Sequence, residues 1–117
     1  MTITRFNIGP RMSQAVRHGN TVYLAGQVAK DYDASVEVQT QQVLDTIDAL
    51  LKQAGTDKSH LLQATVVLNN IADFAAMNSV YDKWIDPANP PTRACIEARM
   101  AHPSLRVEII VIAAMPE

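Results

Sequence analysis

The side chain with the clearest chemical potential is an arginine that opens a predicted β-strand. Pro90 and Pro91 end the preceding segment, and the side chains then alternate between two faces from Thr92 to Arg99. A guanidinium at the end of a strand can reach into a cleft and bind a carboxylate through two parallel hydrogen bonds. Arg93 therefore indicates a site for a small carboxylate, the alternative being an arginine on an exposed strand surface.

Glu108 is the second candidate, because it is the one ionisable residue in the apolar run from Val107 to Ala114. A buried carboxylate costs free energy unless it is paired or protonated. Next to a substrate-binding arginine it could serve as a general base or acid. The alternative is a glutamate at the end of a strand that points to solvent.

Cys95 lies two residues from Arg93, on the same face of the predicted strand. A nearby arginine lowers the pKa of a thiol, so Cys95 could be a nucleophile, although a buried strand cysteine is more often inert packing. Its backbone carbonyl could still accept a hydrogen bond from a ligand. Cys95 is the sole cysteine, which excludes an intramolecular disulfide and a cysteine-based metal site.

The sequence lacks the residues that several other classes of site require. The three histidines are scattered without metal-ligand spacing, and no glycine-rich nucleotide-binding motif occurs, so we expect neither metal nor cofactor. The net charge of −2 provides no basic footprint for nucleic acid or an anionic membrane. Without a signal-peptide or membrane-span pattern, we expect a cytoplasmic protein with a single domain over residues 1–117.

The spacing of apolar side chains predicts the elements that must position these residues. Strands are expected over 12–18 and 21–25, joined by a tight turn at Gly19-Asn20, and over 62–69, 92–99 and 107–115. A helix with an apolar stripe from Val43 to Ala54 should be capped by Ser35 and closed by Gly55. A second helix should begin at Asp73 as N-cap and carry a stripe formed by Phe74, Met77, Tyr81 and Trp84.

The predicted order is β-β-β-α-β-α-β-β, which includes one strand before the first helix beyond the five ranges above. It is an α+β fold with a six-stranded mixed sheet and two helices on one face. The last strand, 107–114, is apolar on both faces, and no further element remains to cover the second face. A large exposed apolar face is rare on a monomer, so we expect further copies of the chain to cover it in a homo-oligomer.

The residues Pro91–Ala98 resemble the signature strand of the Rid family, the YjgF-like reactive-intermediate deaminases. The resemblance runs from about Gly9 to Ala113 in the family's order, and includes Ser13–Val16, Leu24–Val28, Phe74–Tyr81 and Val107–Ile109. It implies a chorismate-mutase-like fold and a homotrimer with a central barrel of sheets, outer helices and three clefts between subunits.

The resemblance also implies an activity, the hydrolysis of 2-imino acids to 2-oxo acids and ammonia without a cofactor. Such imines come from amino-acid dehydratases, oxidases or dehydrogenases. By the family's pattern, Arg93 binds the substrate carboxylate, the backbone at Cys95 contacts the imine nitrogen and Glu108 positions or activates the water. Asn78 and Ala25 match further positions of the substrate site.

The sequence departs from the family's pattern at the expected cleft. Many members carry Gly-Pro-Tyr where this chain has Gly9-Pro10-Arg11, so that aromatic residue is missing, and Ala25 lacks the hydroxyl of a serine. Arg11 or Arg17 could add a positive charge and favour a dicarboxylic or polar imino acid. These changes are typical of a divergent subgroup.

Three functions remain open at this stage. The first is imine hydrolysis, and the second is a non-catalytic sensor that binds small carboxylates through Arg93 with a dispensable Glu108. The third is an isomerisation of the chorismate-mutase type, which needs several cations around a dianion, whereas only Arg93 is evident here. Some relatives are described as ribonucleases, but the acidic balance of this chain argues against nucleic acid.

Overall fold

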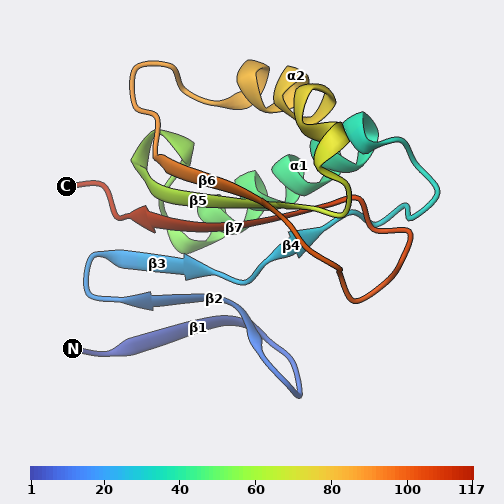
Figure 1. Ribbon diagram of the computed structural model, residues 1–117. Helices are drawn as coiled ribbons and strands as arrows, with labels where there is room; N and C mark the ends of the chain where they lie inside the picture. Colours follow the sequence, from blue (N-terminus) through green and yellow to red (C-terminus); the bar gives the residue numbers. More distant parts are fainter.

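The computed structural model describes all residues 1–117 as a mixed β-sheet with two α-helices on one side (Figure 1). The elements in chain order are β1 (Ile3–Ile8), β2 (Ser13–His18), β3 (Thr21–Leu24), β4 (Gln27–Val28), α1 (Val36–Ala54), the 3₁₀ helix η1 (Lys58–His60), β5 (Leu61–Leu68), the 3₁₀ helix η2 (Ile71–Asp73), α2 (Phe74–Trp84), β6 (Thr92–Glu97) and β7 (Val107–Ala114). Neither α-helix is both long enough and apolar enough to cross a membrane.

The six longer strands lie in the order β1-β2-β3-β7-β5-β6, which confirms the predicted mixed sheet. All pairs are antiparallel except β5–β6, whose parallel strands are connected through α2. The short strand β4 was not predicted, because two residues show no periodicity. It pairs with the first half of β7, beyond the point where β3 ends, and so extends the sheet beside Glu108.

The hairpin between β2 and β3 confirms the Gly19-Asn20 turn, since His18 pairs with Thr21 and Gly19 has φ of 61°. Helix α1 also begins and ends as predicted. The Ser35 hydroxyl accepts a hydrogen bond of 3.2 Å from the backbone N–H of Val38, and Gly55 closes the helix in the left-handed region.

Helix α2 begins directly after Asp73, as predicted, but without the expected side-chain cap. Asp73 stands at the N-cap position but makes no capping hydrogen bond with its side chain. The cap belongs one turn earlier, where Asn70 accepts a hydrogen bond of 2.9 Å from the backbone N–H of Ala72 and starts η2. Phe74 is 42 % exposed, so only Met77, Tyr81 and Trp84 of the predicted stripe are buried.

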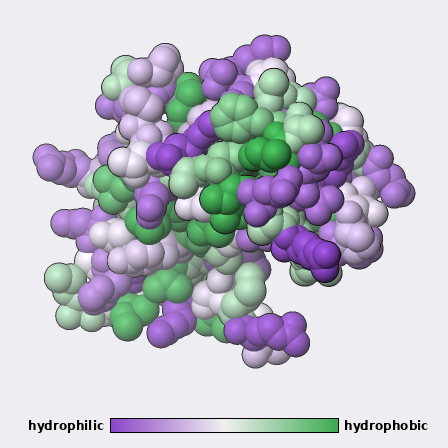
Figure 2. All heavy atoms as spheres, in the orientation of Figure 1, coloured by the Kyte–Doolittle hydropathy of each residue, from purple (hydrophilic) through white to green (hydrophobic).

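The two faces of the sheet differ sharply in burial. Along β7, Val107, Ile109, Val111 and Ala113 are at most 1 % exposed, and they belong to the core that the strands form with α1 and α2. The alternate side chains of β7 are only partly buried, and Ile96 on β6 is 50 % exposed. Figure 2 shows hydrophobic side chains over the middle of the view, where β5, β6 and β7 lie in Figure 1. This open apolar face is the surface that further copies are predicted to cover.

Replacing Ile110 with aspartate should abolish assembly. Ile110 lies on the open face of the central strand, and an unpaired charge buried there costs several kcal/mol. Sedimentation equilibrium should give three times the chain mass for the wild type and a lower mass, or no folded protein, for Ile110→Asp. Val38→Asp is the matched control, since Val38 is 47 % exposed on α1 and should leave the assembly intact. A wild type that is a folded monomer at micromolar concentration would contradict the expectation.

Candidate active site

Arg93 is held against helix α2 on the helix-covered side of the sheet. Its Nη1 donates a hydrogen bond of 2.8 Å to Oδ1 of Asn78. The guanidinium carbon lies 4.8 Å from the ring centre of Tyr81 and 5.8 Å from that of Phe74. Because α2 connects the parallel strands β5 and β6, the fold places these three side chains beside Arg93. The cation–π contacts with the two rings and the hydrogen bond to the Asn78 amide therefore fix the direction of the guanidinium.

No carboxylate neutralises Arg93 within the chain. The two ion pairs of the structure join His60 to Asp57 and Arg106 to Asp73. Burial raises the pKa of the Tyr81 phenol, and the guanidinium opposes this shift less strongly, so the ring beside Arg93 remains neutral at neutral pH. A half-buried arginine that is oriented but not paired is suited to bind an external anion.

Cys95 lies beside Arg93 on β6 and is partly buried. Burial raises the pKa of its thiol, and the positive charge of Arg93 offsets only part of that rise. The thiolate population at neutral pH is therefore small, which favours the packing interpretation over a nucleophile. Since β6 is the edge strand of the sheet, alternate backbone groups along it face away from β5.

Glu108 lies on the other face of the sheet, in a cavity of about 640 Å³. Six of the nine residues that line the cavity are hydrophobic, and the lining includes Met12, Ala25, Gly26, Tyr32, His102 and Leu105. A side chain at position 26 would clash with this carboxylate, because a Cβ added at Gly26 would lie 2.9 Å from Cδ of Glu108. Any other residue at position 26 would displace the Glu108 side chain.

The register of the sheet separates Arg93 from Glu108 within one chain. Glu108 pairs with Val67, and Val67 pairs with Ile96, so these three side chains share the open face. Arg93 is three residues from Ile96 on the same strand, and therefore points to the opposite face. A single site that uses both groups must combine Arg93 of one copy with Glu108 of another.

The remaining predicted site residues divide between the same two places. Asn78 contacts Arg93, whereas Ala25 lines the cavity of Glu108. Met12 also lines that cavity, next to the position of the missing aromatic residue. Arg17 lies elsewhere in the chain: it donates to the carbonyl of Gly19 over 3.1 Å, at the turn of the hairpin. The structure contains no group of three or more His, Cys, Asp and Glu side chains placed to bind a metal ion.

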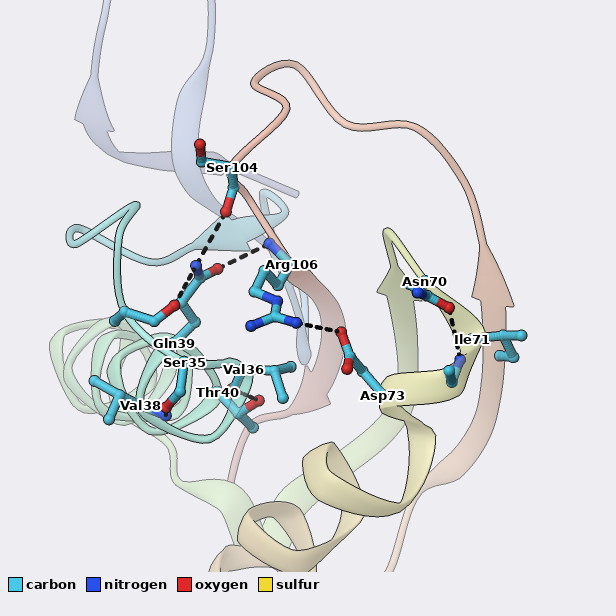
Figure 3. Close-up of polar contacts among 12 residues, drawn as sticks. Ser35, Val36, Val38, Gln39, Thr40, Asn70, Ile71, Asp73, Ser104 and Arg106 are labelled. Atoms are coloured by element: carbon cyan, nitrogen blue, oxygen red, sulfur yellow. Dashed lines mark hydrogen bonds and ion pairs between the residues drawn. The ribbon is translucent and has the colours of Figure 1, made fainter.

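One residue that holds the cavity in place, Gln39, was missed by the sequence analysis. It is fully buried in α1, and its Nε2 contacts the carbonyls of Tyr32, Ala34 and Ser104 at 3.1–3.3 Å. Its Oε1 accepts a hydrogen bond of 2.8 Å from the backbone N–H of Arg106 (Figure 3). A polar residue at a helical position between buried Val36 and Val43 is the signal that could have revealed it.

Replacing Gln39 with leucine should lower the free energy of unfolding by about 3 kcal/mol. The change leaves several backbone groups without partners, and each unsatisfied buried group costs about 1–3 kcal/mol. Urea denaturation at fixed chain concentration measures the effect. Gln41→Leu, on the exposed side of the same helix, is the control and should change the free energy by less than about 0.5 kcal/mol. Equal stabilities of the two variants would show that the Gln39 network adds nothing.

Comparison with known proteins identifies the family. The family model described as endoribonuclease L-PSP matches residues 2–115. A RutC family protein of Haemophilus ducreyi is 46 % identical over 113 residues, which cover 97 % of each chain. The chloroplastic protein named Reactive Intermediate Deaminase A of Arabidopsis thaliana is 34 % identical and covers 92 % of this chain, which spans 60 % of that protein.

A solved structure agrees with this assignment. A member of the YjgF protein family from Neisseria meningitidis has a TM-score of 0.97 and 39 % sequence identity, with 100 % of this chain and 98 % of that one covered. The resemblance that was stated on the Pro91–Ala98 strand is thereby confirmed over nearly the whole length. The chain belongs to the endoribonuclease L-PSP family, which includes the YjgF and RutC family proteins.

Proposed function

We propose that this protein is a 2-imino acid deaminase, which hydrolyses reactive imines to 2-oxo acids and ammonia and works as a homotrimer. The observation that carries the proposal is Arg93, whose guanidinium is oriented by Asn78 and Tyr81 and lacks a carboxylate partner. A substrate with a carboxylate next to the reacting carbon would meet this group. The deaminase name of the relative from Arabidopsis thaliana supports the same reaction class.

The reaction then needs a water and a base near the imine carbon. Arg93 of one copy holds the carboxylate, and the edge backbone at Cys95 contacts the imine nitrogen. Glu108 of a neighbouring copy takes a proton from water while the water oxygen attacks the carbon of the C=N bond. The carboxyl returns that proton to nitrogen, which gives a carbinolamine. It then takes the proton of the new hydroxyl and passes it to the amino group, so that ammonia leaves as the carbonyl forms. One imine and one water thus give one 2-oxo acid and one ammonia.

The open apolar face supports the arrangement in which the two groups come from different copies. Joining that face to a second copy would bury it and would exclude water from the cleft at its edge. The solitary, partly buried cysteine fits a reducing compartment, and we place the reaction in the cytoplasm.

The direct test is removal of an imine by the wild-type protein. An amino-acid oxidase generates 2-imino acids in the assay, and semicarbazide traps those that remain. The protein should lower the yield of semicarbazone in proportion to its concentration, and bovine serum albumin at equal concentration should not. Unchanged semicarbazone for every amino acid in the panel would refute the deaminase.

A sensor that binds small carboxylates is the second candidate. It is favoured by the position of Arg93, which is complete within one chain and does not need Glu108 in order to hold an anion. Wild-type protein that binds a 2-oxo acid but never removes an imine would support the sensor. The net charge of −2 favours neither RNA binding nor RNA cleavage, although the family model carries an endoribonuclease description.

A further inference from the structure

The cavity of Glu108 has a wall made by two rings that come from separate loops. Tyr32 lies between β4 and α1, and His102 lies between β6 and β7. Their ring centres are 4.5 Å apart with an angle of 46° between the planes, and both line the cavity. Nothing in the proposed chemistry uses either ring, although they stand in the same cavity as the proposed base.

The buried amide of Gln39 holds the two loops that carry these rings. Its Nε2 contacts the carbonyl of Tyr32 itself and, in the other loop, the carbonyl of Ser104. Figure 3 shows the amide reaching Ser104 and the backbone of Arg106, which leads into β7 and Glu108. One side chain therefore sets the spacing between both ring-bearing loops and the strand that carries the base.

The His102 residue is also held in place by hydrogen bonds within its own loop. Its Nδ1 accepts a hydrogen bond of 3.1 Å from the backbone N–H of Ser104, and its carbonyl accepts another from Leu105. These two contacts fix the orientation of the imidazole against the loop. The wall thus presents two rings of fixed position to the cavity.

We infer that the Tyr32–His102 wall is the specificity-determining surface of this site, and that it selects 2-imino acids with large apolar side chains. The inference rests on the proposed function, because it assumes that the imine carbon stands at Glu108 with the carboxylate at Arg93 of another copy. The substrate side chain must then enter the remaining space of the cavity. Met12, Val28 and Leu105 line that space with the two rings.

The charges around the cavity disfavour imines that carry a second carboxylate. No lysine or arginine is among the lining residues, and Glu108 contributes a negative charge. A second carboxylate on the substrate would lie beside Glu108 without a cationic partner among the lining residues, and like charges at short range repel each other. The sequence had suggested Arg11 or Arg17 as a partner for a dicarboxylic imine. Arg17 lies at the Gly19 turn, and Arg11, which precedes Met12, is exposed and is not itself in the lining. Leucine- and phenylalanine-derived imines are therefore preferred over those from alanine and glutamate.

The test measures kcat/KM for imines made from leucine, phenylalanine, alanine and glutamate, with semicarbazide trapping. The wild type should favour the leucine imine over the alanine imine by about ten-fold or more, since a few methylenes in an apolar pocket give about 10–200-fold discrimination. In Tyr32→Ala and His102→Ala that ratio should fall about five- to ten-fold, because the leucine imine loses the apolar contact of the wall. His60→Ala, an imidazole on η1 outside the cavity, should keep the wild-type ratio.

A binding measurement separates this inference from the proposed function. Calorimetric titration with 4-methyl-2-oxopentanoate and with 2-oxoglutarate should show about ten-fold tighter binding of the former, and Tyr32→Ala should reduce the difference. Binding with that preference but without turnover would keep the specificity wall and refute the deaminase. Turnover with wild-type ratios in both ring variants, or tighter binding of 2-oxoglutarate, would overturn the inference while the deaminase stands. Absence of both binding and turnover would refute both.

Discussion

Replacing Glu108 with glutamine should lower turnover of 2-imino acids by about 10²–10⁴-fold, the usual contribution of a positioned general base. The amide keeps the shape of the side chain and its fit against Gly26, but it cannot accept a proton from water. Binding of a 2-oxo acid should stay near the wild-type value, because Arg93 lies on the other face of the sheet and is untouched. Imine trapping measures turnover, and calorimetry on the same preparation measures binding.

Glu37→Gln is the matched control for this change, since Glu37 is exposed in the first turn of α1 and should leave both quantities unchanged. Wild-type turnover in Glu108→Gln would remove this carboxylate from the mechanism. Loss of binding together with turnover would instead show that the residue holds the cavity in shape, so the paired measurement separates chemistry from structure.

Truncation of Arg93 to alanine should lower kcat/KM for 2-imino acids by about thirty-fold or more. Losing one partner of a buried, hydrogen-bonded charge pair costs about 2–5 kcal/mol, and each 1.4 kcal/mol is a factor of about ten. The assembly should remain intact, because Arg93 is on the edge strand and its bonded partner is the side chain of Asn78. Steady-state kinetics and sedimentation of the same sample give the two results.

Two further variants test whether the effect depends on the guanidinium and on its position at residue 93. Arg93→Lys should recover only part of the activity, since an ammonium cannot form the paired hydrogen bonds of a guanidinium. Arg99→Ala removes an exposed arginine beyond the end of β6 and should have little effect. Normal kcat/KM in Arg93→Ala would show that the substrate carboxylate binds elsewhere.

Local patterns predicted most of the fold because they act over a few residues. Ser35 and Gly55 bound α1 as expected, and β7 lies within the strand predicted over 107–115. Asp73 was wrong as a side-chain cap, because a 3₁₀ turn that Asn70 caps precedes α2. Asp73 instead lies 3.5 Å from Arg106, a partner in a distant part of the chain that no local pattern shows.

Whether the two main candidate residues share a face of the sheet depends on how strands far apart in the sequence pair with each other. The alternation of β6 placed Arg93 and Cys95 on one face correctly, but only the shared pairing of Val67 shows that Glu108 is on the other face. The wall of Tyr32 and His102 and the amide of Gln39 were missed for the same reason. Each of these contacts joins residues far apart in the sequence, so spacing does not predict the contacts, although the polar residue on the apolar side of α1 marks Gln39 itself as unusual.

Complementation between two impaired variants tests the central claim, that Arg93 of one copy and Glu108 of another form one deaminase site. Arg93→Ala and Glu108→Gln chains with different affinity tags are co-expressed, and assemblies that carry both tags are purified by two successive steps. In a cyclic trimer of mixed composition one site regains both groups, so about a third of wild-type turnover should return, although each variant alone should keep only about a thirtieth or less. Mixed assemblies no more active than the separate variants would contradict the shared site.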